Sequence, residues 1–90
     1  MKVAYANSFV RDLKKLKNRK TGARVLALVE AAKVAMSPAA LGDLVKLTDY
    51  EDCYRIRVGD HRVGVYINGD RIEFVRALPR KEFYRLFPPR

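Results

Sequence analysis

The spacing of apolar residues changes once along this chain, and that change limits the folds open to it. In residues 7–36 the apolar residues recur every three or four positions, as they do along one face of a helix. From residue 44 onward they alternate with polar residues, as they do in strands with one buried face. A helical half followed by a strand half predicts an α+β fold, with two helices packed on one face of a small antiparallel sheet.

Two helices are expected in the first half, after a short strand near residues 3–5. Asn7 or Ser8 can cap the first helix, and Thr21 can cap the second, because short polar side chains accept hydrogen bonds from free helical N–H groups. The second helix is expected to bury one apolar stripe: Val25, Leu28, Val29, Ala32 and Met36. It should end at Pro38, since the residue before a proline avoids helical geometry. Each helix is too short to be stable alone and needs a sheet to pack on.

Two turn signals predict how the later strands pair. A two-residue loop at Gly59-Asp60 pairs Arg57 with Arg62, and Asn68-Gly69 predicts a type I′ turn into the last strand. Both turns place the same apolar residues on one side: Ile56, Val58, Val63, Val65, Ile67, Ile72 and Phe74, with Leu78 following in the last strand. The other side receives Arg55, Arg57, Arg62, Gly64, Tyr66, Arg71, Glu73, Val75 and Ala77. We therefore expect helices on the first side and a basic, open face on the second.

The balance of charge is extreme for the length of the chain. The net charge is +9 and the sequence pI is about 10.1, which favours a polyanionic partner such as nucleic acid, an acidic protein or an anionic membrane surface. Ninety residues predict one domain, over 1–90. Cys53 is the single cysteine and is expected to be a small core residue, so neither a disulfide nor a metal site is predicted. Neither a membrane-spanning run nor a signal peptide is apparent, which predicts a cytoplasmic location without a membrane partner.

Arginines gather on the predicted open face, where Glu73 is the one acidic residue. Arg57 and Arg62 should face each other and repel, so an anionic ligand explains them better than folding does. Guanidinium groups bind phosphate oxygens in bidentate fashion, and Tyr84 can stack on an unpaired base. RNA is therefore the expected ligand, although a solvated polar face is the alternative. His61, the single histidine, should point away from this face.

Three stretches of the chain together resemble a known family. They are Lys46-Leu47, the run Tyr-Arg-Ile-Arg-Val-Gly-Asp-His-Arg-Val at 54–63, and Val-Arg-Ala-Leu-Pro-Arg-Lys-Glu-Phe-Tyr-Arg at 75–85. With the two helices, they resemble the RelE branch of the RelE/ParE toxin superfamily over nearly the whole chain. The run from Tyr54 to Arg62 is the specific part of the likeness.

The resemblance implies a bacterial or archaeal toxin of a type II toxin–antitoxin pair. RelE members cut messenger RNA in the ribosomal A site without a metal or cofactor, through attack of the ribose 2′-oxygen on the adjacent phosphate. By position, the resemblance implies catalytic roles for Arg55, Arg57, Arg62, Arg80 and Tyr84, and RNA contacts for Lys46 and Lys81. Within the first set, Arg62 would stabilise the phosphorane, Arg80 would serve the leaving oxygen and Tyr84 would stack on a base. A short, acidic RelB-like antitoxin is the implied partner in a hetero-oligomer, beside the ribosome and messenger RNA.

Two positions depart from the family pattern. Pro79 stands where many relatives have histidine or another polar residue, and Arg55 stands for a lysine. Arginine hardly ever loses its proton, so no general base is assigned. The alternative function is a non-nuclease member, either a ParE-like gyrase inhibitor or a protein that only binds its antitoxin. A generic basic RNA-binding domain is a third possibility.

Overall fold

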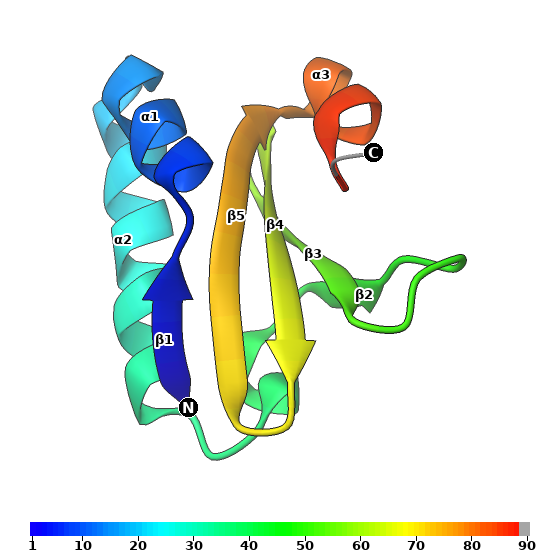
Figure 1. Cartoon of the computed structure of the whole chain (residues 1–90). Helices are drawn as coiled ribbons and strands as arrows, with labels where there is room; N and C mark the ends of the chain where they lie inside the picture. Colours follow the sequence, from blue (N-terminus) through cyan, green and yellow to red (C-terminus); the bar gives the residue numbers. More distant parts are fainter. Residues whose placement is uncertain (89–90) are drawn as a thin grey trace.

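The computed structural model describes residues 1–88 and arranges them in layers around one sheet (Figure 1). The elements in chain order are β1 (Lys2–Tyr5), α1 (Asn7–Lys15), α2 (Arg19–Val34), the 3-10 helix η1 (Pro38–Leu41), β2 (Leu44–Lys46), β3 (Cys53–Val58), β4 (His61–Asn68), β5 (Arg71–Pro79) and α3 (Arg80–Leu86). The last two residues of the predicted domain, 89–90, lie outside the described residues. Within 1–88, no helix is both long enough and apolar enough to cross a membrane.

The first strand of the chain pairs with the last. The five strands lie in the order β1-β5-β4-β3-β2. β1 runs parallel to β5, with Lys2 opposite Arg71, whereas the other pairs are antiparallel. The α+β class is confirmed, but the sheet is mixed rather than antiparallel throughout. Tight turns fix the direction of neighbouring strands only, and β1 reaches the rest of the sheet through two helices.

α1 and α2 cover one face of the sheet and form the main core with it. Phe9 of α1 and Val25 and Val29 of α2 are buried against β3, β4 and β5. The predicted apolar side of the sheet is confirmed as buried: Ile56, Val58, Val63, Val65, Ile67, Ile72 and Phe74. The stripe predicted for α2 is wrong at its end, because the helix stops at Val34 and leaves Met36 97% exposed.

The helix caps also differ from the prediction. Asn18, not Thr21, caps α2: its side-chain oxygen accepts a hydrogen bond from the Thr21 N–H at 3.1 Å. The residue before α1 is Ala6, which cannot cap with its side chain. Ser8, one of the predicted caps, instead donates its hydroxyl to the carbonyl of Val75 in β5 at 2.6 Å.

Both hairpins turn at a glycine–aspartate pair. Gly59-Asp60 joins β3 to β4 with the predicted register, and Gly59 has a φ of 57°. β4 and β5 are joined by Gly69-Asp70, with a φ of 60° at Gly69, rather than by Asn68-Gly69. Positive φ at the first loop position alone is typical of a type II′ turn, which needs glycine there. The register of β4 with β5 therefore differs by two residues from the predicted one. An even shift keeps each side chain on the same side of the sheet, so the side chains beside the turn keep their predicted faces.

A β-bulge in β5 then reverses the faces of its last residues. Two adjacent residues of β4 pair with Phe74 and Arg76, so Val75 is the extra residue. Beyond it, Ala77 joins the helix-side core and Leu78 lies on the opposite side of the sheet. The predicted faces of these two residues are therefore wrong, because alternation cannot reveal an inserted residue.

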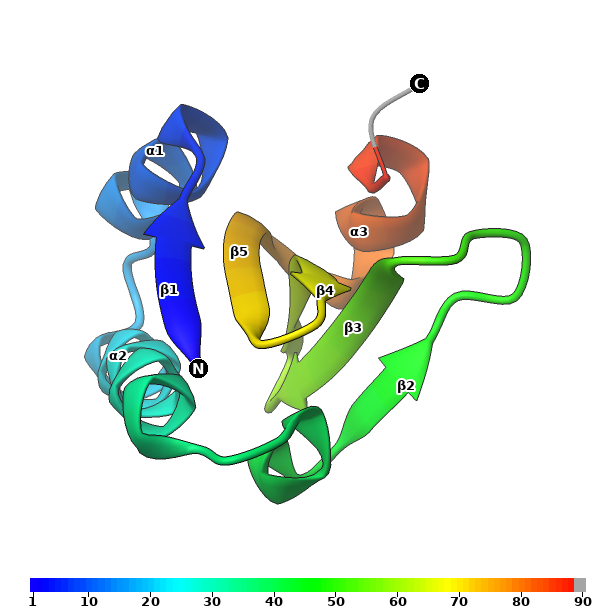
Figure 2. The same ribbon diagram turned by 60° about the horizontal axis from the view of Figure 1, so that its bottom comes forward.

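α3 packs on the second face of the sheet, which is therefore not the open surface that was predicted (Figure 2). Phe83 in α3 and Phe87 just after it lie in a second apolar cluster with Val75 and Leu78. Gly64 makes room for them: a methyl group there would lie 2.7 Å from the Phe87 ring. The spacing of Phe83 and Phe87, one helical turn apart, is the sequence signal for this layer.

Gly64→Ala is expected to lower the free energy of unfolding by about 1–3 kcal/mol, because the new methyl group would overlap the Phe87 ring. Urea unfolding followed by circular dichroism measures the change. Gly22→Ala in α2 is the matched control, since its methyl group would meet only Leu16, at 4.0 Å. That control should gain up to about 1 kcal/mol from helix propensity. Equal effects of the two substitutions would contradict this packing of α3.

Candidate nucleic-acid interface

Arginines meet across the β3–β4 hairpin on the α3 side of the sheet. Arg57 pairs with Arg62 and Arg55 pairs with Gly64, as predicted. Arg57 is exposed and Arg55 is half-buried. None of these arginines takes part in an ion pair within residues 1–88. Because facing like charges destabilise a hairpin, this arrangement favours an anionic ligand.

The guanidinium group of Arg62 is held by the backbone of its own hairpin. The residue is only 8% exposed, and its Nη1 donates to the carbonyls of Gly59 and His61, both at 3.0 Å. Its Nε and Nη2 have no hydrogen-bond partner in the described part of the chain. Arginine keeps its charge when buried. Arg62 is thus a fixed cation with donors left for the two oxygens of a phosphate.

α3 brings a second set of predicted residues to the same turn. The backbone N–H of Arg80 donates to the carbonyl of Asp60 at 2.8 Å, which ties the start of the helix to the β3–β4 turn. Lys81 follows, and both side chains are exposed. Tyr84 is 56% exposed and rests edge-on against the buried ring of Phe83, with ring centroids 5.0 Å apart. An aromatic ring that is anchored by such a contact and is more than half exposed can stack on a base.

Lys46 lies apart from the other predicted residues. It is at the end of β2, the edge strand on the far side of β3. It pairs with Tyr54, whose ring packs against the helix-side core. Paired residues point to the same side of a sheet. The structure therefore directs Lys46 away from the face that carries Arg55 and Arg57.

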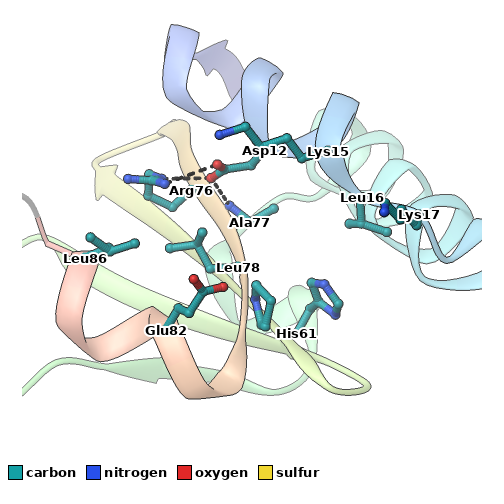
Figure 3. A pocket seen from close by; sticks show the side chains of 11 residues that line it. Asp12, Lys15, Leu16, Lys17, His61, Arg76, Ala77, Leu78, Glu82 and Leu86 are labelled. Atoms are coloured by element: carbon teal, nitrogen blue, oxygen red, sulfur yellow. Dashed lines mark hydrogen bonds and ion pairs between the residues drawn. The ribbon is translucent and has the colours of Figure 1, made fainter.

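Sequence reasoning missed an ion pair that joins α1 to β5. Asp12 is 7% exposed and accepts hydrogen bonds from Arg76 Nε at 2.7 Å and Nη2 at 3.1 Å. The same carboxylate accepts the backbone N–H of Ala77 at 3.0 Å (Figure 3). The signal was an acidic residue one turn after Phe9, on the buried side of α1. Unlike the hairpin arginines, Arg76 is neutralised within the fold.

A cavity of about 300 Å³ adjoins this ion pair, between α1, the end of β5 and α3 (Figure 3). His61 lines it, on the helix side of the sheet and away from the arginine face, as expected. Its Nδ1 is buried and has no hydrogen-bond partner among residues 1–88. Glu82 and Lys17 also line this cavity. In the described part of the chain, no group of three or more histidine, cysteine or acidic residues is placed to hold a metal ion.

Cys53 is a core residue, as predicted. It is 4% exposed and belongs to the apolar cluster beneath α3. Burial, followed by the adjacent Asp52 carboxylate, raises the pKa of the Cys53 thiol to about 11. The thiol is therefore protonated at neutral pH, where it is a poor nucleophile.

Known proteins match this chain over nearly its whole length. A family model for the ParE toxin of the type II toxin–antitoxin system parDE matches residues 3–84. Toxin RelE3 of Methanocaldococcus jannaschii is 40% identical over 89 residues, which are 98% of this chain and 100% of that protein. The RelB–RelE antitoxin–toxin complex from Methanococcus jannaschii contains a chain that matches with a TM-score of 0.79 and 36% identity, over 94% of this chain and 99% of that one. For the archaeal RelE–RelB complex from Pyrococcus horikoshii the TM-score is 0.71 and the identity 26%, over 91% and 97% of the two chains.

Asp12→Asn is expected to lower the free energy of unfolding by about 2–4 kcal/mol, because it leaves the Arg76 charge unpaired in a partly buried site. Denaturant unfolding measures this loss. Glu82→Gln is the matched control, since it removes an exposed carboxylate 3.7 Å from Arg85. Its effect should stay below about 1 kcal/mol. A similar, small loss in both variants would show that the Asp12 pair does not hold α1 to the sheet.

Proposed function

The chain belongs to the ParE toxin family of type II toxin–antitoxin systems, as a RelE-type toxin, and from this premise we propose that it cleaves messenger RNA on the ribosome. The observation that carries the proposal is the convergence of Arg57, Arg62 and Arg80 on one hairpin turn. No ion pair within residues 1–88 neutralises them. The proposed place of action is the cytoplasm, where ribosomes translate.

The proposed reaction is a transphosphorylation within the RNA strand. The ribose 2′-oxygen loses its proton to water and bonds to the adjacent phosphorus, and the bond from phosphorus to the 5′-oxygen breaks. The products are a 2′,3′-cyclic phosphate and a leaving 5′-oxyanion, which takes up a proton to become the 5′-hydroxyl. The phosphorane between them carries more negative charge than the starting diester. Fixed cations stabilise such a state without reorganising.

Each arginine would then act from the place that the fold gives it. Arg62, fixed by the carbonyls of Gly59 and His61, would bind the phosphorane oxygens through its free donors. Arg80, at the start of α3, would stabilise the leaving oxygen, and Tyr84 would stack on a neighbouring base. Arg55 and Arg57 would supply further positive charge along β3. The mechanism assigns no protein side chain as general base and no metal ion.

The proposed partner is an acidic, RelB-like antitoxin that forms a hetero-oligomer with this chain. The supporting observations are the solved archaeal relatives, which are complexes of RelE with RelB. The net charge of +9 also favours an acidic binding segment.

Arg62→Ala is expected to reduce messenger RNA cleavage at least about 100-fold, because a preorganised donor to the transition state is lost. Primer extension in a purified translation system measures the cuts. Arg71→Ala is the matched control: Arg71 is an exposed arginine at the opposite end of the same sheet, beside the β4–β5 turn. The Arg71→Ala variant should cleave messenger RNA to the same extent as the wild type.

Because Arg62 is buried, Arg62→Lys provides a second variant that keeps the charge but loses the two-pronged donor. Circular dichroism establishes that each variant is folded. Folded Arg62 variants that cut normally would overturn the assignment of Arg62. A wild-type chain that leaves messenger RNA intact but inhibits purified DNA gyrase would replace the proposed nuclease with a ParE-like activity.

A further inference from the structure

A fourth arginine reaches the β3–β4 turn from the other side of the sheet. Arg24 lies in α2, which begins at the same end of the molecule as α3 and this turn (Figure 1). A methyl group on Gly59 would lie 3.1 Å from Arg24 Nη1, so the guanidinium group rests against the turn itself. Arg24 is exposed, and nothing in the local sequence connects it with the hairpin.

Three elements therefore direct arginines to a two-residue loop. Arg24 of α2 lies against Gly59. The Gly59 carbonyl accepts a hydrogen bond from the guanidinium group of Arg62 in β4. Arg80 of α3 is bonded through its backbone to Asp60. The ion pairs within residues 1–88 are Glu30–Lys33, Asp12–Arg76 and Glu82–Arg85.

Arg24 and its neighbours at the turn are absent from those pairs, although an exposed Asp60 lies in the loop. Like charges gathered at one loop repel one another, and water and salt screen the repulsion only in part. A polyanionic strand with one phosphate at Arg62 and the next at Arg24 would relieve the repulsion on both sides of the loop.

We propose that Arg24 binds a backbone phosphate of the RNA substrate strand next to the scissile one, so that the strand crosses the β3–β4 turn from the α3 side to the α2 side. This inference rests on the proposed RNA cleavage. It makes Arg24 a binding residue rather than a catalytic one, because it contacts the substrate away from the reacting atoms. Its contribution is therefore to affinity, and it depends on salt.

Fluorescence anisotropy with a single-stranded RNA oligonucleotide tests the proposal without requiring cleavage. Arg24→Ala should weaken binding about three- to tenfold at 0.1 M salt, and should reduce the magnitude of the negative slope of log K against log salt by about 0.7, the value for one phosphate contact with a single strand. Arg24→Lys should recover most of the slope, since a lysine retains the charge. Arg71→Ala, at the far end of the sheet, should change the affinity less than Arg24→Ala does.

Equal affinities and slopes for Arg24→Ala and Arg71→Ala would overturn the proposal. The proposal would also be overturned if Arg24→Ala weakened binding only to ribosomes without messenger RNA, as measured by sedimentation. The phosphate that Arg24 contacts would then belong to ribosomal RNA. If the wild type cleaves messenger RNA but Arg24→Ala binds RNA with unchanged affinity and salt slope, the proposed nuclease activity is kept and the proposed Arg24 contact is rejected. If the wild type does not cleave messenger RNA but Arg24→Ala still alters the salt slope, the Arg24 contact is kept and the nuclease activity is rejected.

Discussion

The open edge of β5 is the constraint on which the rest of this structure depends. β1 covers that edge only as far as Phe74, and β5 continues to Pro79. An uncovered edge leaves backbone groups without partners and invites pairing with other chains. α1 covers it with side chains instead of a strand: Ser8 donates to the Val75 carbonyl and Asp12 accepts from the Ala77 N–H. The positive charge of Arg76 then neutralises the Asp12 carboxylate.

This arrangement sets the geometry of the candidate interface. The bulge at Val75 lies where α1 takes over from β1, and it turns Leu78 toward the α3 side of the sheet. Leu78 pairs with Arg62 there, and Pro79 pairs with His61. α3 consequently begins beside the β3–β4 turn, where Arg80 bonds to Asp60. A shift of one residue in β5 would move the start of α3 and its arginine away from the hairpin.

The arginines that lie against the sheet differ in whether the fold neutralises them. Arg76 is held by a buried carboxylate and stabilises the contact between α1 and the sheet. Arg24, Arg57 and Arg62 have no ion-pair partner in the part of the chain that the structure describes. Since α3 buries the middle of the second sheet face, the exposed side chains of Arg24, Arg57 and Arg80 lie around the β3–β4 turn at one end of the sheet rather than across an open face.

Local signals in the sequence determined the α+β class, the helix-side core and the pairing of Arg57 with Arg62. Apolar period and turn residues act between near neighbours, so they can be read without the fold. The tertiary structure alone decided the parallel pairing of β1, the bulge at Val75, the Asp12–Arg76 pair and the contact of Arg24 with Gly59. The β1 pairing, the Asp12–Arg76 pair and the Arg24 contact join segments far apart in the chain, so their energies come from burial and charge that exist only once those segments have met. The bulge at Val75 lies between neighbouring strands, but apolar alternation cannot reveal an inserted residue.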